Sequence, residues 1–130
     1  MTVYLSAEQV KDLHRRQLAR YGGLGGLQDR GALEAAIARP QMTFGGEDLY
    51  QDVAAKAAAS LHSVVLNHPF VDGNKRVGAH AAVLFLLSNG FELTASPAML
   101  ADVTLATARG ELSAEALAIW FRQRSRPIER

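Results

Sequence analysis

The sequence of 130 residues contains no cysteine and has almost no excess of charge of either sign. Without cysteine the chain cannot be a disulfide scaffold, hold zinc or iron–sulfur clusters through thiolates, or use a cysteine nucleophile. The 14 Lys and Arg residues are balanced by 13 Asp and Glu residues, which gives a net charge of +1. This balance gives no reason to expect direct binding to nucleic acid or to an anionic membrane surface.

Long apolar runs and targeting segments are also missing. The most apolar run, residues 81–87, is far shorter than the roughly 20 residues that cross a bilayer. The first six residues have no basic stretch leading into an apolar one, so no signal peptide is expected. We therefore expect a cytoplasmic protein, and the length predicts one domain over residues 1–130.

Side chains that favour strands are few. Val, Ile and Thr together supply 17 residues, whereas Ala and Leu supply 39, and this ratio favours helix. Apolar spacing and capping residues predict an all-α fold of six helices: residues 7–20, 30–38, 53–67, 75–88, 97 to a stop at Gly110, and a last helix after Ser113. The fourth helix is apolar nearly all round, so we expect it to be the buried centre of the domain.

Three segments between these helices have no predicted chemistry. The glycine-rich residues 22–26 follow a helix rather than a strand, so we interpret them as a linker and not as a nucleotide loop. Residues 41–50 predict a loop or a short hairpin. The arginine-rich residues 122–130 predict a solvated tail.

The informative segment is residues 67–76, Asn-His-Pro-Phe-Val-Asp-Gly-Asn-Lys-Arg. Pro69 disfavours helical backbone at the residue before it, so His68 leaves the third helix and projects from a bend. An imidazole in this position can take a proton from a hydroxyl group near neutral pH. Phe70 is an apolar side chain in a polar loop, and we expect it to enter the core and fix the loop.

The start of the fourth helix predicts a site for phosphate. With Asn74 as the helix cap, the backbone N–H groups of Lys75, Arg76 and Val77 have no helical partners. Open amides beside a lysine and an arginine suit an anion. Gly73 removes the side chain that would block a close approach of the backbone to the ligand.

Asp72 adds a carboxylate beside these groups, which suits a magnesium ion bridging nucleotide phosphates. Together with His68 it completes the groups needed for phosphoryl or nucleotidyl transfer. A purely structural interpretation is also open, in which His68 is a loop residue, Asp72 only caps the helix, and Lys75 and Arg76 form a solvated first turn. Two basic residues at a helix N-terminus oppose the helix dipole, however, and a bound anion explains them.

The nine residues 68–76 resemble the signature of the Fic/Doc family, His-x-Phe-x-(Asp/Glu)-(Ala/Gly)-Asn-(Lys/Gly)-Arg. Residues 26–29 and 33–40 also resemble the upstream region of Doc toxins, so the resemblance covers essentially the whole chain. It implies the six-helix Fic fold, with the motif leading into a buried central helix. It also implies a role for each motif residue: His68 as catalytic base, Asp72 as magnesium ligand, Asn74, Lys75 and Arg76 as ligands of the phosphates of ATP, and Phe70 as the anchor of the loop.

Departures from the motif of AMP-transferring Fic enzymes favour another reaction. Those enzymes have a second glycine and a second arginine where this chain has Lys75 and Ala79, and losing the arginine removes a bidentate phosphate ligand. Both differences match Doc proteins, which the resemblance implies are protein kinases that present the γ-phosphoryl group of ATP to the base; the implied target is a threonine of elongation factor Tu. Gly73 is the variant typical of Fic enzymes, so AMP transfer stays open as an alternative. His80, one turn after Arg76, could flank the nucleotide.

The chain has no recognisable inhibitory helix of its own. Ser88 with Glu92 and Thr107 with Glu111 have the spacing of the inhibitory motif of Fic enzymes, but each pair is followed by leucine and neither lies in a separate terminal helix. The resemblance therefore implies a Phd-type antitoxin, which would dock over a groove lined by the first helix, residues 41–50 and the motif. A second alternative is a catalytically silent module that acts only through its antitoxin and operator DNA.

Overall fold

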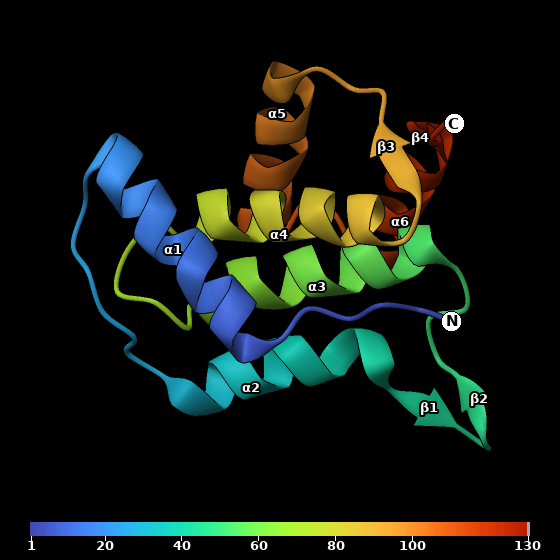
Figure 1. Ribbon diagram of the computed structural model, residues 1–130, viewed down its shortest axis with the longest axis horizontal. Helices are drawn as coiled ribbons and strands as arrows, with labels where there is room; N and C mark the ends of the chain where they lie inside the picture. The colour runs from blue at the N-terminus through green and yellow to red at the C-terminus, as the bar shows by residue number, and fades with distance from the viewer. Residues whose placement is uncertain (130) are drawn as a thin grey trace.

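The computed structural model describes residues 1–129, and that range contains six α-helices (Figure 1). They are α1 (Ala7–Tyr21), α2 (Arg30–Ala38), α3 (Val53–Asn67), α4 (Asn74–Ser88), α5 (Pro97–Ala108) and α6 (Ala114–Gln123), with a 3₁₀ turn, η1 (Arg39–Gln41), after α2. Five of the six begin at a Ser or Asp whose side chain accepts a backbone N–H of the first turn. The predicted all-α fold of six helices is confirmed.

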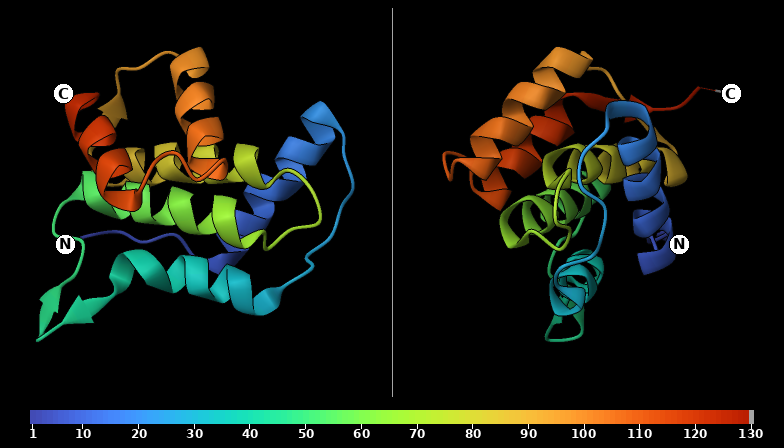
Figure 2. Two further views of the ribbon diagram at one scale, coloured as in Figure 1. Left: turned by 180° about the vertical axis from the view of Figure 1, so that it is seen from behind. Right: turned by 90° about the vertical axis from the view of Figure 1, so that its left-hand side faces the viewer.

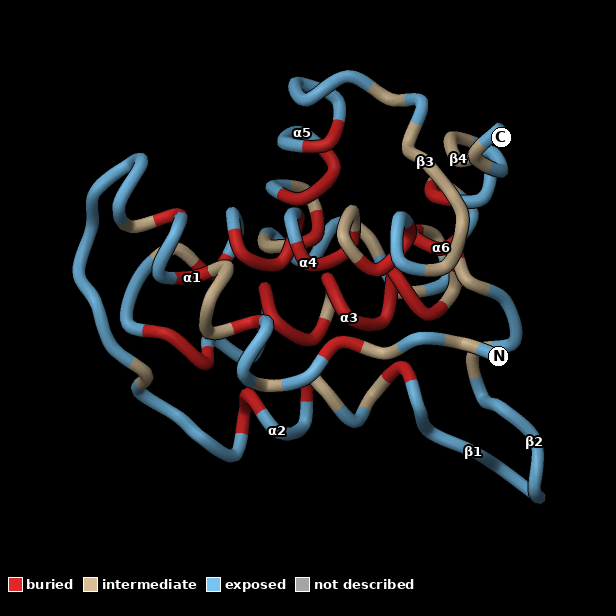
Figure 3. The backbone as a smooth tube through the Cα atoms, in the orientation of Figure 1, coloured by how far each residue is buried: buried red, intermediate tan, exposed pale blue. Residues whose placement is uncertain are grey.

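The core is organised around α3, which packs against α2, α4, α5 and α6 (Figures 1 and 2). Nearly the whole length of α3 is buried (Figure 3), and the side chains of Ala57, Ala58 and Ala59 are 0% exposed. Helix α4, the predicted buried helix, packs against α1, α3 and α5 and buries eight of its 15 residues, whereas α3 buries ten of 15; near the end of α4, Leu87 is 47% exposed. No helix within residues 1–129 is both long enough and apolar enough to cross a bilayer.

Helices α3 and α4 approach each other closely at Gly78. A Cβ atom at this position would lie 2.9 Å from Cγ2 of Val65 and 3.5 Å from the carbonyl oxygen of Leu61. Val65 is fully buried, so its side chain has little room to move away. The absence of a side chain at Gly78 therefore sets the distance between the two helices that carry the motif.

We expect Gly78→Ala to destabilise the fold. Overpacking a core costs about 1–3 kcal/mol, which outweighs the gain of about 1 kcal/mol from replacing a helical glycine by alanine. Urea unfolding should therefore show a lower free energy of unfolding for the variant, and adding Val65→Ala should restore part of the loss. A more stable Gly78→Ala variant would mean that the two helices have room to spare.

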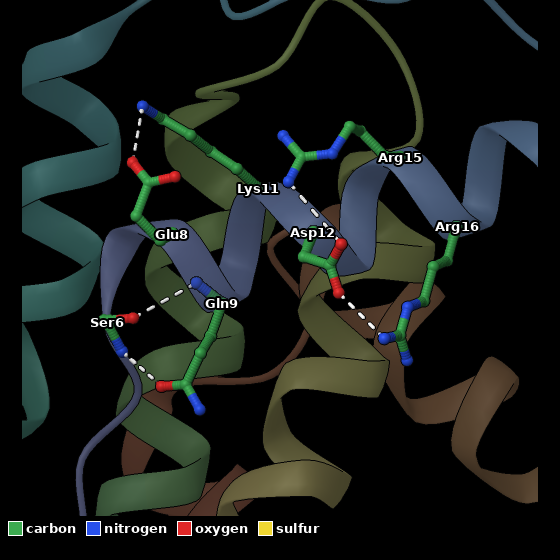
Figure 4. Close-up of polar contacts among 7 residues, drawn as sticks. All are labelled: Ser6, Glu8, Gln9, Lys11, Asp12, Arg15 and Arg16. Carbon is green, nitrogen blue, oxygen red and sulfur yellow. Dashed lines mark hydrogen bonds and ion pairs between the residues drawn. The ribbon is translucent and has the colours of Figure 1, made fainter.

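Helix α1 is fixed at its start by a reciprocal cap. The backbone N–H of Gln9 donates to Oγ of Ser6 at 3.2 Å, and the backbone N–H of Ser6 donates to Oε1 of Gln9 at 2.8 Å (Figure 4). The outer face of α1 carries exposed ion pairs, among them Asp12 with Arg16 at 3.0 Å. Its inner face buries His14 and Gln17, so polar side chains of α1 face the interior.

Two short antiparallel strand pairs complete the fold. Strands β1 (Thr43–Phe44) and β2 (Glu47–Asp48) form a hairpin after η1, which agrees with the predicted loop or short hairpin. Strand β3 (Phe91–Leu93) pairs with β4 (Ser125–Pro127) near the C-terminus. The predicted solvated tail is thus wrong for part of residues 122–129, where Arg126 also pairs with Glu92 at 2.7 Å.

The hairpin is attached to the start of α3 by a buried lysine. Lys56 is 2% exposed, and its Nζ donates to Oδ2 of Asp48 at 3.0 Å and to the carbonyl oxygen of Tyr50. Arg39 adds a hydrogen bond of 3.0 Å from Nε to the hydroxyl oxygen of Tyr50. The hairpin therefore belongs to the end of the molecule where α3 begins.

The cap of α3 is also an ion pair, which makes part of the stability depend on pH. Arg122 donates to both carboxylate oxygens of Asp52, at 2.6 and 3.1 Å, and this hydrogen bonding holds the pKa of Asp52 below its ordinary value of 3.8. The folded carboxylate thus stays charged to lower pH than the unfolded one. The pair stabilises the fold above about pH 4, and its contribution is lost as the pH falls through the lowered pKa.

Asp52→Asn should keep the cap and remove the ion pair. Because both side chains are about half exposed, we expect a loss of only about 0.2–1 kcal/mol at pH 7, and a smaller loss at pH 3. Urea unfolding at both pH values measures the difference, with Asp102→Asn on α5, an exposed residue that makes no ion pair within residues 1–129, as the control. A loss of equal size at pH 3 and pH 7 would contradict this interpretation.

Candidate active site

The motif loop, residues 68–73, is held by the loop between α1 and α2. Leu27 and Phe70 form an isolated antiparallel bridge, and the backbone N–H of Val71 donates to the carbonyl oxygen of Gly26 at 3.0 Å. Both loops lie at the same end of the molecule (Figure 1). Residues distant in sequence therefore fix the backbone on which the predicted site residues stand.

The carboxylate of Asp72 lies against this second loop. Its Oδ2 accepts the backbone N–H of Leu24 at 3.3 Å, and its Oδ1 accepts the N–H of Gly73 at 2.9 Å. A Cβ atom at Gly23, whose φ is +118°, would lie 2.8 Å from Oδ2 of Asp72, so this position needs glycine. The prediction that residues 22–26 are a plain linker is wrong, because their backbone forms one wall of the site.

The surroundings of Asp72 fit a magnesium ion. The residue is exposed, and each of its oxygens keeps a lone pair beyond the one that accepts a backbone N–H. Within residues 1–129 no group of three or more His, Cys, Asp and Glu side chains is placed to hold a metal. Magnesium commonly takes one or two carboxylates and completes its shell with substrate phosphates and water, so a single carboxylate beside a phosphate site is sufficient.

His68 ends α3 in an unusual backbone conformation. It is the one non-glycine residue with positive φ in the part of the chain described, at φ 48° and ψ 60°. Such a conformation costs on the order of 1 kcal/mol for a residue with a Cβ atom. The left-handed conformation turns the chain out of α3, so that the imidazole of His68 is exposed and lies beside the start of α4.

The side chain of Asn74 joins the motif loop to the start of α4. Its Oδ1 accepts the N–H of Phe70 at 3.0 Å, while its Nδ2 donates to the carbonyl oxygen of Phe70 at 2.9 Å and to Nδ1 of His68 at 3.3 Å. The expectation that Asn74 caps α4 is wrong, since Gly73 is the N-cap, with φ 81°, and no side chain caps this helix. The Asn74 side chain is occupied in joining the loop to the helix.

The start of α4 presents open amides. With Gly73 as the N-cap, the N–H groups of Asn74, Lys75 and Arg76 are the ones without helical partners. The sequence predicted that the N–H of Val77 would be open in place of that of Asn74. In the structure the N–H of Val77 donates to the carbonyl oxygen of Gly73 at 3.0 Å, so the open amides begin one residue earlier. The geometry of an anion site at a helix N-terminus is therefore present, one position earlier than the sequence suggested.

The cations of the motif are exposed and available. No carboxylate in residues 1–129 pairs with Lys75 or Arg76. The guanidinium carbon of Arg76 lies 4.5 Å from the centre of the Tyr21 ring, and that of Arg20 lies 5.4 Å from the same ring. Tyr21, which sequence reasoning did not identify, thus holds Arg76 by a cation–π contact at the end of α1.

His14 is a second residue that sequence reasoning missed. It is 4% exposed, and its ring stacks on that of Phe70 with centroids 4.0 Å apart. Its Nε2 donates to the carbonyl oxygen of Asp72 at 2.8 Å. Phe70 itself is 1% exposed, so its side chain anchors the loop in the core. His14 fixes the same loop through its stacking on Phe70 and its hydrogen bond to Asp72.

His80 lies on α4 outside the loop and faces α1. The side chain of Gln17 makes a hydrogen bond from Nε2 to Nδ1 of His80. Burial lowers the pKa of His80, and the nearby charge of Arg20 lowers it further, so the ring is neutral at pH 7. Both residues line a pocket of about 390 Å³ between α1, α4 and α5, to which Lys75 and Arg76 also contribute.

The hairpin of residues 43–48 does not belong to the site. Lys56, which anchors it, precedes His68 by a span of α3 that measures roughly 18 Å along the helix axis. Figure 1 shows the hairpin at the opposite end of α3 from the motif loop. The predicted groove lined by helix one, residues 41–50 and the motif is therefore wrong for residues 41–50; the α1–α2 loop takes that place beside the motif.

The helical fold, with this loop–helix junction, agrees with the result of comparing the sequence with protein families. The model of the Fic/DOC family matches residues 4–86, which include α1 to α3, the motif and most of α4. The chain belongs to the Fic/Doc family.

Two curated proteins are similar over most of the chain. "Protein kinase doc" of Escherichia phage P1 is 38% identical over 120 residues, which are 92% of this chain and 94% of the phage protein. "Toxin Doc" of Mycolicibacterium smegmatis is 47% identical over 95 residues, which are 73% of this chain and 71% of that protein. The first similarity spans both the motif and the C-terminal helices, so the family fold extends beyond residue 86.

Proposed function

We propose that this chain is a Doc-type toxin, a protein kinase that transfers the γ-phosphoryl group of ATP to a hydroxyl group of elongation factor Tu and so arrests translation and growth. The observation that carries the proposal is the junction of α3 and α4, where an exposed imidazole, a carboxylate and three open amides meet. The names of the two related proteins, a protein kinase and a toxin, support it. Lys75 and Ala79, in place of a glycine and an arginine, favour the kinase over AMP transfer.

The proposed reaction is a displacement at the γ-phosphorus. The target hydroxyl oxygen forms a bond to phosphorus while the bond to the β–γ bridging oxygen breaks, and ADP leaves with that electron pair. The hydroxyl proton passes to His68. A general base of this kind contributes about 10²–10⁴-fold to the rate.

The contact between Asn74 and His68 limits which ring nitrogen takes the proton. Asn74 donates to Nδ1 of His68, so a neutral ring in this arrangement carries its own hydrogen on Nε2. Uptake of a proton at Nε2 requires the other tautomer. We therefore propose that this contact, which is long at 3.3 Å, breaks when the target binds and the ring turns toward the hydroxyl.

The remaining motif residues would hold the phosphates. The amides of residues 74–76 and the side chains of Lys75 and Arg76 supply hydrogen bonds and positive charge to the phosphate chain. Asp72 would hold a magnesium ion, which neutralises phosphate charge when bound. The side chains of His14 and Asn74 would act indirectly, because they fix the loop that carries His68 and Asp72.

Inhibition of the toxin would come from another chain. Of the two sequence matches to an inhibitory motif, Thr107 is fully buried and its hydroxyl donates to the carbonyl oxygen of Val103 at 2.8 Å, which leaves it unsuited to a regulatory surface. We propose a Phd-type antitoxin that covers the loop–helix junction. Its binding would block both ATP and the target hydroxyl.

A cell-free translation system tests the proposed target. Adding the protein with ATP and magnesium should stop synthesis, and a later addition of fresh elongation factor Tu, after the toxin is removed, should restore it. Restoration by another translation component, and not by elongation factor Tu, would contradict the proposed target. If synthesis continues although the added protein is folded, the proposed inhibition of translation is contradicted.

A further inference from the structure

The hairpin of β1 and β2 presents an aromatic side chain to solvent. Phe44, at the end of β1, is 82% exposed, and every residue of both strands is exposed (Figure 3). Figure 1 shows the hairpin projecting from the end of the molecule at which α3 begins. Met42 and Leu49 lie at its base, and each is 49% exposed. Three large apolar side chains thus share one exposed segment, as at an interaction surface.

The base of the hairpin holds Phe44 in place. The N–H of Leu49 donates to the carbonyl oxygen of Met42 at 2.8 Å, and buried Lys56 binds the carboxylate of Asp48 at 3.0 Å. An apolar side chain on a fixed support loses little conformational freedom when it binds a partner. Phe44 is therefore suited to insertion into a groove.

A groove of about 510 Å³ lies beside the base of the same hairpin. Its apolar lining comes from Leu49, from Ala55 of α3, and from Ala118 and Ile119 of α6. Ile119 is 51% exposed, so the groove is an open apolar surface. Phe44 is not among the residues that line it, so the hairpin leaves its own groove unfilled. The volume is large enough to accept an aromatic side chain.

The charges of the hairpin and of the groove are complementary. The groove is lined by Arg39 and Arg122 and by one carboxylate, that of Glu115. Arg122 pairs with Asp52, whereas neither Arg39 nor Glu47 of the hairpin forms an ion pair within residues 1–129. Arg39 donates to the hydroxyl oxygen of Tyr50 and to Nδ1 of His62, which uses two of its five N–H groups. A guanidinium in the groove can therefore bind an incoming carboxylate.

Phe44 and Glu47 are presented together. They are directly opposite each other in the register of β1 and β2, and residues opposite each other in an antiparallel pair project from the same face. A ring inserted into such a groove therefore brings a free carboxylate with it. One end of this chain thus carries both an apolar and acidic projection and the apolar and basic groove that fits it.

We propose that this end of the molecule binds a second copy of the chain, with Phe44 of each copy in the groove of the other and Glu47 on Arg39. A two-fold axis makes the two contacts identical, because the same surface supplies both halves. The motif loop is at the opposite end of α3 and stays accessible in the pair (Figure 1). The inference does not depend on the proposed kinase function.

The size of the surface sets the expected strength. A short hairpin and one groove on each copy bury less than the roughly 1,200–2,000 Å² of a standard stable interface. We therefore expect a reversible dimer with a Kd of about 1–100 µM. Sedimentation of the full chain at concentrations from about 1 µM to about 1 mM covers this range.

Phe44→Ser should weaken the dimer by about 100-fold or more, because two buried rings are lost from each pair. Its stability in urea should equal that of the wild type, since Phe44 is exposed in the single chain. Met99→Ser is the matched control. Met99 is 42% exposed on α5 and lies outside the hairpin and the groove, so this variant should dimerise like the wild type.

A mixture of two variants tests whether the insertion is reciprocal. Ile119→Asp puts a charge into the apolar part of the groove and should also prevent dimerisation. Phe44→Ser mixed with Ile119→Asp should associate more tightly than either variant alone, because the mixed pair keeps one intact contact.

Two results would overturn the proposal. A wild-type chain that stays monomeric at the highest concentration would leave the groove to a different protein. A dimer that survives Phe44→Ser or Ile119→Asp would place the interface elsewhere. A mixture that associates no more tightly than the separate variants would contradict the reciprocal insertion.

Discussion

Replacing His68 is expected to reduce phosphoryl transfer by about 10²–10⁴-fold, because the target hydroxyl then has no base to take its proton. Alanine would also change the cost of the left-handed backbone at this position, where φ is 48°. Asn tolerates that conformation better than most residues with a Cβ atom, so His68→Asn is the cleaner variant. Initial rates of phosphate transfer from labelled ATP, with ATP affinity measured in parallel, separate catalysis from binding.

The controls for His68 are a structural readout and a second histidine. His68→Asn should unfold at the same urea concentration as the wild type within error, since the ring is exposed and makes only one long hydrogen bond to a side chain. His62→Ala, on the same helix but hydrogen-bonded to Arg39 away from the motif, should keep full transfer activity. Growth arrest by His68→Asn equal to that of the wild type would favour the silent binding module over the kinase.

Asn74→Ala is expected to damage both the fold and the site. The substitution leaves the N–H and the carbonyl oxygen of Phe70 without their partners, although Phe70 is 1% exposed. Each of the two unsatisfied buried groups costs about 1–3 kcal/mol, so we expect a loss of about 2–6 kcal/mol in the free energy of unfolding. Activity should fall even where the variant is folded, because His68 and Asp72 stand on the released loop.

Asn74→Asp distinguishes the two hydrogen bonds. Aspartate keeps an acceptor for the N–H of Phe70 and loses the donor to its carbonyl oxygen, so urea unfolding should place this variant between alanine and the wild type. A stability of Asn74→Ala within about 0.5 kcal/mol of the wild type would contradict the role assigned to this side chain. The comparison needs only the free chain, so it does not depend on the target.

The limits of the helices could be predicted because the signals that set them are local. Ser6 with Gln9, and Asp52 with the N–H of Ala55, are contacts within one turn, and both were recognisable from the sequence. The cap of α4 could not be predicted in the same way. Asn74 has a side chain that can cap a helix, but this side chain makes its hydrogen bonds to the backbone of Phe70 instead of to the first turn of α4. Gly73 is therefore the N-cap.

The contacts that complete the site join distant segments. Nothing local in residues 22–26 indicates that Leu24 donates to Asp72, or that Gly23 must lack a side chain for that approach. One signal was available for His14 and Gln17: both fall on the apolar stripe of α1 that begins at Val10. Polar residues on a buried stripe of a helix need partners, and here those partners are the motif loop and His80.

The mass that the protein adds to its target is the most direct test of the account. Elongation factor Tu incubated with the wild-type chain, ATP and magnesium should gain the mass of one phosphate, on a hydroxyl side chain, and should gain nothing with His68→Asn. That result follows from a γ-phosphate placed next to His68. A gain equal to one AMP group would contradict the proposed orientation of the nucleotide, and an unmodified target would contradict the assigned substrate.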